Sequence, residues 1–454
     1  MTAIKDTSCG ERVESVEPGF VPTDVTEVDI ACALPRLASR DTASGLRYGS
    51  ARVLVRLASE PLGFVSVPLP REGLGPSELA GRIWSALGDR IRERVQGPNR
   101  RPLDGIPLEG IAPELAGGYA SQRETAVRMA PMASIVLCTR DRADRVRRCL
   151  EAVMAQKYPA YEVVVVDNAP TSNDTAVVVS ELQGRIPVRR VVEPVPGLSR
   201  ARNRGLHEAK GSIVAFVDDD EIPDSYWLAE LALGFDVDGA VGCVTGMVLP
   251  AALETKAQAL FEEYGGHSKN RGFQEITFDP SVRGVQHPLY PLPPFGAGGN
   301  MAFSRQALID IGGFDPALGA GTPTKAAEDT AAFADVMLQG YRLVYRPAAI
   351  VWHCHHVHSS GLSTQLFGYG AGLTSYFVRV LWRRPAAAVD LLKLAPRGLR
   401  DLLAPSSQRF ATMTVPFPRE LLAAHRRGML WGLIAYPVTL WEQRCQERHG
   451  RRSA

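Results

Sequence analysis

Three consecutive carboxylates behind a short apolar run are the most informative chemical feature of this sequence. Asp218-Asp219-Asp220 directly follow Ile213-Val214-Ala215-Phe216-Val217, whose length and β-branched content are typical of a buried strand. Three acids at one strand end repel each other unless a cation lies among them. Hard cations such as Mg²⁺ and Mn²⁺ take oxygen ligands and keep positions open for phosphates. The run therefore predicts a metal site that holds a diphosphate; the alternative is a solvated acidic turn closed by Pro223.

Polar residues also end two earlier predicted strands. The apolar strand 134–138 is followed by Thr139, and the unbroken β-branched run 163–166 is followed by Asp167. Helical patterns separate these strands, and this alternation predicts an α/β domain with a mainly parallel central sheet. In such sheets ligands bind at the carboxyl ends of the strands, so these clusters should converge on one site.

Composition is that of an ordinary globular protein. The chain has 454 residues, of which 45% are hydrophobic and 22% are charged. Its net charge is +2, so the overall charge does not indicate a nucleic-acid partner. The seven cysteines are scattered and include no Cys-x-x-Cys pair, which favours reduced thiols and a cytoplasmic location. Residues 1–22 lack the apolar core of a signal peptide, and we find no convincing membrane span.

The sequence divides into four parts. Residues 1–27 are polar and without periodicity, and we expect them to be disordered. Residues 28–118 predict a small α+β domain of unknown role, with a hairpin over 52–67, a helix ending near Val95 and a Gly/Pro-rich linker at its end. Residues 130–360 hold the α/β domain, and residues 361–454 predict a helical, basic C-terminal region.

Several segments match successive motifs of a known enzyme family. They are Ser134-Ile-Val-Leu-Cys-Thr-Arg-Asp-Arg142, Val163-Val-Val-Val-Asp-Asn168, Gly197-Leu-Ser-Arg-Ala-Arg-Asn-Arg-Gly205, Val217-Asp-Asp-Asp220, Phe295-Gly-Ala-Gly-Gly-Asn-Met-Ala-Phe303, Gly312-Gly-Phe-Asp315 and Ala327-Glu-Asp329. In order and spacing the set resembles family 2 inverting glycosyltransferases, which have the GT-A nucleotide-diphospho-sugar transferase fold. The resemblance covers roughly residues 132–360. It implies that one sugar moves from a nucleotide-sugar donor to an acceptor.

The resemblance also implies roles for individual residues. Asp167 would accept the N3 hydrogen of uracil or thymine, which points to a UDP- or dTDP-sugar; a turn-capping role is the alternative. Arginine suits phosphate because its planar guanidinium can donate two hydrogen bonds. The residues expected to bind the donor are Thr139, Arg142, Asp167, Arg202, Asn203, Asp218 and Asn300.

A metal site and a general base complete the expected machinery. Asp218, Asp220 and His353 would hold Mg²⁺ or Mn²⁺, since a first-row metal also accepts neutral imidazole. Asp329 matches the family's general base, which takes the proton from the acceptor hydroxyl. Acids in a first helical turn are also favoured by the helix dipole alone, which is the alternative for Asp329.

The C-terminal region suggests a further partner. From residue 379 to 454 there are 14 Lys/Arg against 5 Asp/Glu, and these are interleaved with Leu and Trp. Such basic, apolar helices suit peripheral contact with an anionic membrane. Packing on the catalytic domain or contact within a homodimer would need the same pattern.

The sequence leaves two other functions open. A nucleotidyl- or phosphotransferase would also need acids, a metal and basic residues, but no Gly-x-x-x-x-Gly-Lys-Ser/Thr loop is present. A non-catalytic module that binds a nucleotide sugar is the third hypothesis, and the presence of Asp329 argues against it. The acceptor is a glycan, a lipid-linked sugar or a small molecule, within cell-envelope glycan, glycolipid or secondary-metabolite synthesis.

Overall fold

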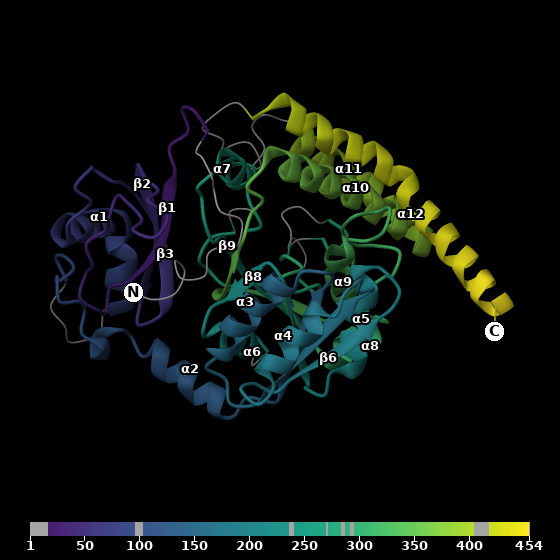
Figure 1. Cartoon of the computed structure of the whole chain (residues 1–454), viewed down its shortest axis with the longest axis horizontal. Helices are drawn as coiled ribbons and strands as arrows, with labels where there is room; N and C mark the ends of the chain where they lie inside the picture. The colour runs from purple at the N-terminus through teal and green to yellow at the C-terminus, as the bar shows by residue number, and fades with distance from the viewer. Residues whose placement is uncertain are drawn as a thin grey trace.

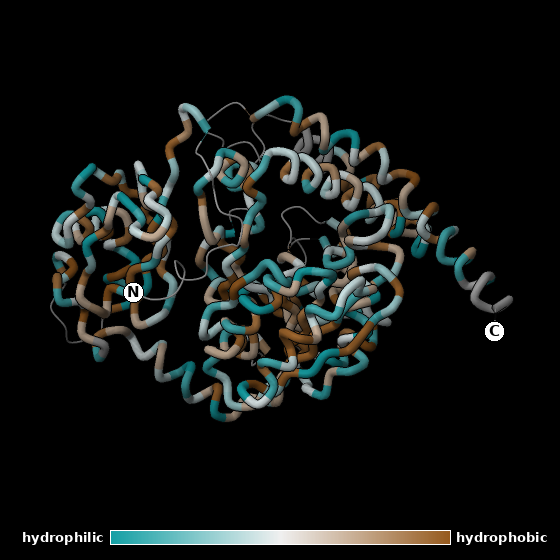
Figure 2. The backbone as a smooth tube through the Cα atoms, viewed as in Figure 1, coloured by the Kyte–Doolittle hydropathy of each residue, from teal (hydrophilic) through white to brown (hydrophobic). Residues whose placement is uncertain are grey.

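The computed structural model describes residues 17–95, 103–235, 240–268, 271–282, 287–290, 295–403 and 417–453. Figure 1 shows a small N-terminal unit, a larger α/β domain and long C-terminal helices along one side of it. Hydrophobic residues gather in the interior of the α/β domain (Figure 2). These observations confirm the predicted α/β class, the separate N-terminal α+β unit and the helical C-terminal region.

The N-terminal unit is a three-stranded sheet covered by one helix. It contains β1 (Thr23–Asp29), β2 (Ser50–Leu57), β3 (Glu60–Pro68) and α1 (Pro76–Val95). Strands β2 and β3 form the predicted hairpin, and the apolar face of α1 packs on the sheet through Leu79, Ile83 and Ile91. Residues 23–27 were expected to be disordered, but they form part of β1, because Val25 and Val28 are buried and the strand pairs with β2. Residues 1–16 lie outside the described ranges.

A short connection joins the two units. It consists of the 3₁₀ turn η1 (Pro113–Leu115) and α2 (Tyr119–Arg128). In the α/β domain the sheet order is β10-β12-β9-β11-β7-β4-β5-β6, and β8 pairs with β12. Its strands are β4 (Ala133–Thr139), β5 (Tyr161–Asn168), β6 (Val188–Glu193), β7 (Ile213–Asp218), β8 (Glu221–Pro223), β9 (Val241–Pro250), β10 (Ile276–Phe278), β11 (Met301–Ser304) and β12 (Arg342–His353).

The helices cover both faces of this sheet. They are α3 (Ala143–Met154), α4 (Asp174–Leu182), α5 (Leu198–Glu208), α6 (Trp227–Leu233), α8 (Arg305–Asp310) and α9 (Glu328–Leu338). Helix α7 (Lys256–Glu263) shares an apolar cluster with the C-terminal helices. Alternate residues of β4 point to opposite faces: Ile135 packs with α3, α4 and α6, and Val136 packs with α5, α8 and α9. Burial on both faces explains why β4 and β5 are unbroken apolar runs.

The predicted parallel core is present, with antiparallel additions. Strands β7, β4, β5 and β6 run parallel, so their carboxyl ends meet at one edge of the sheet. Strand β11 is antiparallel to both of its neighbours, and β8 and β10 are antiparallel to β12. The strand ends that carry the predicted site therefore lie side by side.

The C-terminal region forms two long helices in close contact. The elements are α10 (Ser359–Arg383), the 3₁₀ turn η2 (Pro385–Ala387), α11 (Ala388–Leu403) and α12 (Arg419–Ser453). A Cβ added at Gly370 would lie 2.1 Å from the carbonyl oxygen of His425, and one at Gly428 would lie 2.0 Å from that of Phe367. Glycine therefore permits the two backbones to touch. Within the described ranges, the helices lack a stretch long and apolar enough for a membrane span.

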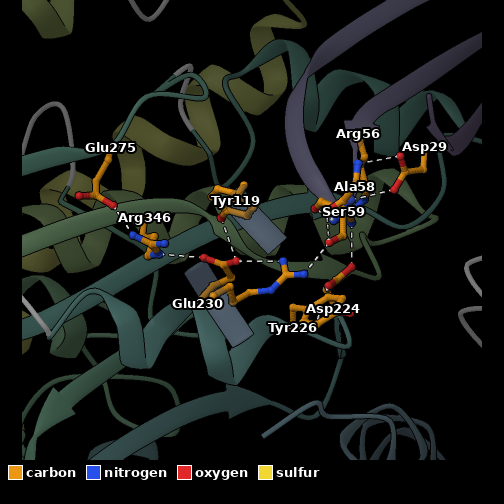
Figure 3. A network of polar contacts seen from close by, with 11 residues as sticks. Asp29, Arg56, Ala58, Ser59, Tyr119, Asp224, Tyr226, Glu230, Glu275 and Arg346 are labelled. Atoms are coloured by element: carbon orange, nitrogen blue, oxygen red, sulfur yellow. Dashed lines mark hydrogen bonds and ion pairs between the residues drawn. The ribbon is translucent and has the colours of Figure 1, made fainter. Parts of the chain in front are cut away.

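A buried group of charges joins the N-terminal unit, α2 and the α/β domain (Figure 3). Glu230 has no exposed surface; its carboxylate accepts from Tyr119 Oη at 2.8 Å, Arg123 Nη1 at 3.2 Å and Arg346 Nε at 2.9 Å. Arg123 also donates to Ser59 Oγ at 2.6 Å. We call Glu230 and these three partners, Tyr119, Arg123 and Arg346, the inter-domain cluster.

Most of the described cysteines behave as expected. Cys32, Cys138, Cys149, Cys243 and Cys445 are free thiols, and burial raises the pKa of Cys138 to about 12. Cys354 differs from the expectation of reduced thiols, because it is disulfide-bonded. Scattered cysteine spacing does not reveal a pairing that only the tertiary fold creates.

Candidate functional site

Thr139 and Asp167 stand next to each other at the ends of adjacent parallel strands. The two residues are register partners in the β4–β5 pairing. Asp167 is fully buried, and its Oδ2 accepts from Arg190 Nε at 2.8 Å. Its Oδ1 is also buried and has no hydrogen-bond partner among the described residues. Burial raises the pKa of Asp167 against the opposing charge of Arg190. A buried acceptor without a partner is costly, so Oδ1 is suited to an N–H group of a ligand.

The three acids after β7 have different partners. Asp218 Oδ1 accepts from Arg202 Nη2 at 3.0 Å, and Asp220 Oδ2 accepts from Arg145 Nη1 at 3.0 Å. Asp219 lies between them and is 6% exposed. The acids therefore point in different directions, which reduces their mutual repulsion.

Asp219 is bound by two residues that were expected to contact the nucleoside. Its Oδ2 accepts from Thr139 Oγ1 at 2.7 Å, and its Oδ1 accepts from Arg142 Nη1 at 3.1 Å. Burial, followed by the charge of Asp220, raises the pKa of Asp219 to about 6. The alternation of an extended strand predicts Asp219 on the opposite side from its neighbours, but the chain turns here, and Asp219 instead ties β4 to β7.

Arg202 connects three separate motifs. It lies in α5 and is 1% exposed. Its Nη2 donates to Asp218 Oδ1 and to the carbonyl oxygen of Gly298, each at 3.0 Å, and its Nη1 donates to Glu328 Oε1 at 2.7 Å. Burial raises the pKa of Glu328 to about 7 despite the opposing charge of Arg202. One guanidinium thus joins the triple acid, the glycine-rich loop and the first turn of α9.

Asp329 lies beside this guanidinium. Its Oδ1 accepts from the Thr330 backbone N–H at 2.6 Å. A Cβ added at Gly298 would lie 3.1 Å both from Asp329 Oδ2 and from Arg202 Nη2, so the two side chains flank the same glycine. Ala327, two residues earlier, has a positive φ of 79°, a conformation that costs a non-glycine residue energy and is common at functional sites.

We call the acids of this edge and their arginines the strand-end cluster. Its carboxylates are Asp218, Asp219, Asp220, Glu221, Glu328 and Asp329, and its arginines are Arg142, Arg145 and Arg202. Glu221 is buried and its Oε2 faces the Asp218 backbone N–H at 3.3 Å. Burial raises the pKa of Glu221 well above its ordinary value. The cluster carries more acids than arginines, so a bound cation would relieve it.

The residues present fit a hard divalent cation. His353 Nε2 lies 3.7 Å from Asp220 Oδ1, a separation that two ligands of one metal ion can adopt. Burial lowers the pKa of His353 to about 4, which keeps the imidazole in its neutral, metal-binding form. Asp218, the third expected ligand, faces Arg202, and the described residues contain no group of three or more His, Cys, Asp or Glu side chains gathered as a complete metal site. Two protein ligands plus diphosphate oxygens are typical of Mg²⁺ sites in enzymes that bind phosphates.

Two residues expected to bind the donor are occupied by protein contacts. Asn203 exchanges two hydrogen bonds of 2.8 Å with the backbone of Phe314. Asn300 is fully buried, and its amide contacts Trp227 Nε1 and the carbonyl oxygens of Met247 and Ala349. Both asparagines therefore hold loops in place, and we leave them out of the proposed donor site.

Tyr369 is a residue of this edge that the sequence did not indicate. It lies on α10, and Gln365 Nε2 donates to its hydroxyl at 3.0 Å. Burial raises its pKa, and the charges of Asp329 and Asp220 add to this effect.

The segment that carries most of this site is similar to known proteins. Residues 134–312 match the family model described as glycosyl transferase family 2. This segment is a family 2 glycosyltransferase domain. The match includes Thr139, Asp167, Arg202 and the triple acid, whereas Asp329 lies beyond its end.

Curated relatives match over limited lengths. The uncharacterized glycosyltransferase YibD of Escherichia coli is 34% identical over 110 residues, which is 24% of this chain and 32% of YibD. A glucosyl-dolichyl phosphate glucuronosyltransferase of Haloferax volcanii is 27% identical over 187 residues, which is 40% of this chain and 55% of that protein. The chain thus spans from about a third to about half of these relatives.

A solved structure also resembles the chain. It is the mannosyltransferase PcManGT from Pyrobaculum calidifontis in complex with GDP-Man and Mn²⁺, with 20% identity and a TM-score of 0.44 over 71% of this chain and 94% of that one. A similarity of this size identifies neither a ligand nor a function.

Proposed function

We propose that this protein is a glycosyltransferase that moves one sugar from a UDP- or dTDP-sugar to an acceptor hydroxyl, with inversion and with a divalent cation. The observation that carries the proposal is the position of Arg202. Its guanidinium contacts Asp218 of the triple acid and Glu328 of α9, and Asp329 lies next to it. Groups suited to a donor diphosphate and a group suited to an acceptor hydroxyl are thus neighbours.

The choice of a pyrimidine donor is supported by Asp167. Its unpaired, buried Oδ1 can accept the N3–H of uracil or thymine. A purine such as guanine would offer a different pattern of donors and acceptors at this carboxylate. Arg142, whose side chain is 52% exposed, can contact the nucleotide while it holds Asp219.

Asp220 and His353 are the proposed metal ligands, with Asp218 close by. Mg²⁺ or Mn²⁺ would neutralise negative charge on the departing nucleoside diphosphate. Arg145 keeps the carboxylate of Asp220 in place, and Arg202 does the same for Asp218. The acceptor hydroxyl would then attack the sugar without the help of a second carboxylic acid. Glycosidases, by contrast, need two carboxyl groups.

Asp329 is the proposed general base. Thr330 holds its Oδ1, so Oδ2 is the oxygen available to take the proton as the acceptor hydroxyl attacks the anomeric carbon. The chain lacks the Gln-x-x-Arg-Trp signature of processive synthases after this base, which supports transfer of one sugar per encounter.

A lipid-linked or cell-envelope acceptor is supported by the C-terminal helices and by the similarity to the glucosyl-dolichyl phosphate glucuronosyltransferase of Haloferax volcanii. Large apolar side chains are exposed on α10, α11 and α12, among them Trp382 at 56%, Leu392 at 73%, Leu430 at 70% and Trp441 at 66%. Basic residues lie between them, so peripheral contact with an anionic membrane at its cytoplasmic face is our proposal. Co-sedimentation with anionic and neutral liposomes tests it: a Trp382→Ser/Leu392→Ser/Leu430→Ser variant should lose the anionic-liposome binding. A concentration-dependent dimer that this variant abolishes would favour a homodimer contact instead.

A donor screen with purified protein tests the reaction. Release of UDP or dTDP with a glycosylated product supports sugar transfer. Release of pyrophosphate would support a nucleotidyltransferase instead. Binding of donors without turnover, whatever acceptor is supplied, would favour a non-catalytic binding module.

A further inference from the structure

The N-terminal unit reaches the donor site through one arginine. Arg52 of β2 donates from Nη1 to Glu262 Oε2 of α7 at 2.7 Å. The guanidinium also lies over the ring of Phe64, 4.4 Å from its centroid, which fixes its direction. The side chains of Arg52 and Glu262 are 28% and 16% exposed, so this ion pair is largely shielded from solvent.

Glu262 also contacts His355, which in turn contacts His353. Its Oε1 lies 3.0 Å from His355 Nε2, and His355 Nδ1 lies 2.6 Å from His353 Nδ1. The histidines are 5% and 8% exposed. A Cβ at Gly266 would lie 2.3 Å from Glu262 Oε1, so a glycine with positive φ makes room for the carboxylate. The contacts form an unbroken path from Arg52 to His353.

This path fixes which nitrogen of His353 carries the hydrogen. The Glu262 carboxylate only accepts hydrogen bonds, so His355 must donate from Nε2. When His355 carries its single ring hydrogen on Nε2, its Nδ1 is an acceptor and receives the hydrogen from His353 Nδ1. His353 Nε2 is left with a lone pair, and this is the nitrogen that faces Asp220 Oδ1 at 3.7 Å.

The direction of the path follows from its contacts: Glu262 Oε1 faces His355 Nε2, the two Nδ1 atoms face each other, and His353 Nε2 faces Asp220.

We propose that Arg52, Glu262 and His355 are positioning residues that aim the Nε2 lone pair of His353 at the cation of the donor site. The N-terminal unit then acts on the donor site through Glu262 and His355. This inference rests on the proposed function only for the identity of the bound cation. Carboxylate–histidine pairs behind a ligating imidazole fix its tautomer and orientation in the same way.

The N-terminal unit also contacts the segment that follows the triple acid. Arg56 of β2 is 6% exposed and donates from Nη2 to Asp224 Oδ2 at 2.7 Å (Figure 3). Asp224 follows β8, in which Glu221 is the register partner of His353 in β12. The N-terminal unit thus holds the segment after the triple acid as well as the histidine.

The test replaces the acceptor at the centre of the path. Glu262→Leu removes the group that receives the His355 hydrogen, and Glu262→Gln keeps a carbonyl acceptor there. Tyr48→Phe is the matched control, because Tyr48 Oη donates to Glu254 Oε1 at 2.8 Å across the same two units without contacting the path. The readouts are the tautomer of His353, by ¹⁵N NMR of the imidazoles assigned with His353→Asn, and calorimetry of Mn²⁺ in the presence of UDP.

The wild-type chain should show His353 protonated on Nδ1, and Glu262→Leu should lose this preference and bind Mn²⁺ about 10- to 100-fold more weakly. Glu262→Gln should retain the tautomer, and Tyr48→Phe should match the wild type in both readouts. If Glu262→Leu does not fold, Arg52→Met takes its place, with a smaller loss of affinity in the same direction. Wild-type His353 protonated on Nε2, or an unchanged tautomer and affinity in a folded variant, would overturn the proposal. Absence of Mn²⁺ binding in the wild type with the Nδ1 tautomer present would instead contradict the proposed function.

Discussion

Two groups of charged side chains in this protein consist mainly of carboxylates and arginines but differ in the ratio of the two. In the inter-domain cluster Glu230 faces Arg123 and Arg346 as well as Tyr119, and both of its oxygens are occupied. In the strand-end cluster six carboxylates share three arginines, and burial raises the pKa of Glu328 to about 7. The carboxylate of the first cluster is balanced by two arginines, whereas the second cluster has more carboxylates than arginines. This difference distinguishes a structural network from one suited to bind a charged ligand.

The difference between the clusters predicts that the strand-end cluster alone affects turnover. Asp329→Asn removes the proposed base and should lower turnover by about 10²- to 10⁴-fold, because the acceptor hydroxyl loses its proton acceptor. UDP affinity should stay unchanged, since Asn keeps the size of the side chain. The measurement is nucleotide release with the donor found by screening, alongside calorimetry of UDP. Asp174→Asn, an acid in the first turn of α4, is the control and should retain full turnover.

The inter-domain cluster should instead dominate stability. Glu230→Ala leaves the buried Arg123 without a carboxylate partner and removes the buried partner of Arg346, which should lower the free energy of unfolding by about 3–5 kcal/mol. Glu275→Ala removes the more exposed partner of Arg346 and should cost at most about 1 kcal/mol. Urea denaturation of both variants gives the comparison. Equal losses would mean that the balance of charges within a cluster does not determine its role.

The excess of acid at the strand ends should also appear as a pH dependence. The ordinary pKa of Glu328 is 4.5, and burial raises it to about 7 in the folded chain, so the folded state holds this proton more tightly than the unfolded state. The free energy of unfolding should therefore fall as pH rises from about 4.5 to about 7, by on the order of 1–3 kcal/mol from this group. Glu328→Gln should lose that part of the slope.

Urea unfolding at pH 5 and pH 8 without divalent cations measures this effect. Asp219, with a pKa of about 6 from the same cause, adds to the wild-type slope and should remain in the variant. A Glu328→Gln chain whose pH dependence equals that of the wild type would show that Glu328 is ionised across this range.

Local sequence patterns were sufficient to predict the strands that position the site. Unbroken β-branched runs predicted β4, β5 and β7, and parallel order placed Thr139, Asp167 and the triple acid at one edge. The pairing of acids with particular arginines could not be predicted, since Arg202 and Glu328 are 126 positions apart and only the fold brings them together. The same holds for Arg52 and Glu262, 210 positions apart.

Asn203 and Asn300 show where a sequence motif is insufficient. Their motifs predicted donor contacts, but a motif does not reveal whether an amide faces a ligand or a loop. In the fold each amide is hydrogen-bonded to backbone or side-chain groups. Asp219, to which the sequence assigned no role, is the shared acceptor of Thr139 and Arg142.

Calorimetry of UDP with and without Mn²⁺, on the wild-type chain and on Asp220→Ala, tests the central claim most directly. The claim is that the acid excess at the strand ends receives a nucleoside diphosphate together with a cation. We predict UDP binding that depends on Mn²⁺ in the wild type and loses this dependence in Asp220→Ala. UDP binding that is equally strong without Mn²⁺, or an unchanged metal dependence in Asp220→Ala, would contradict it.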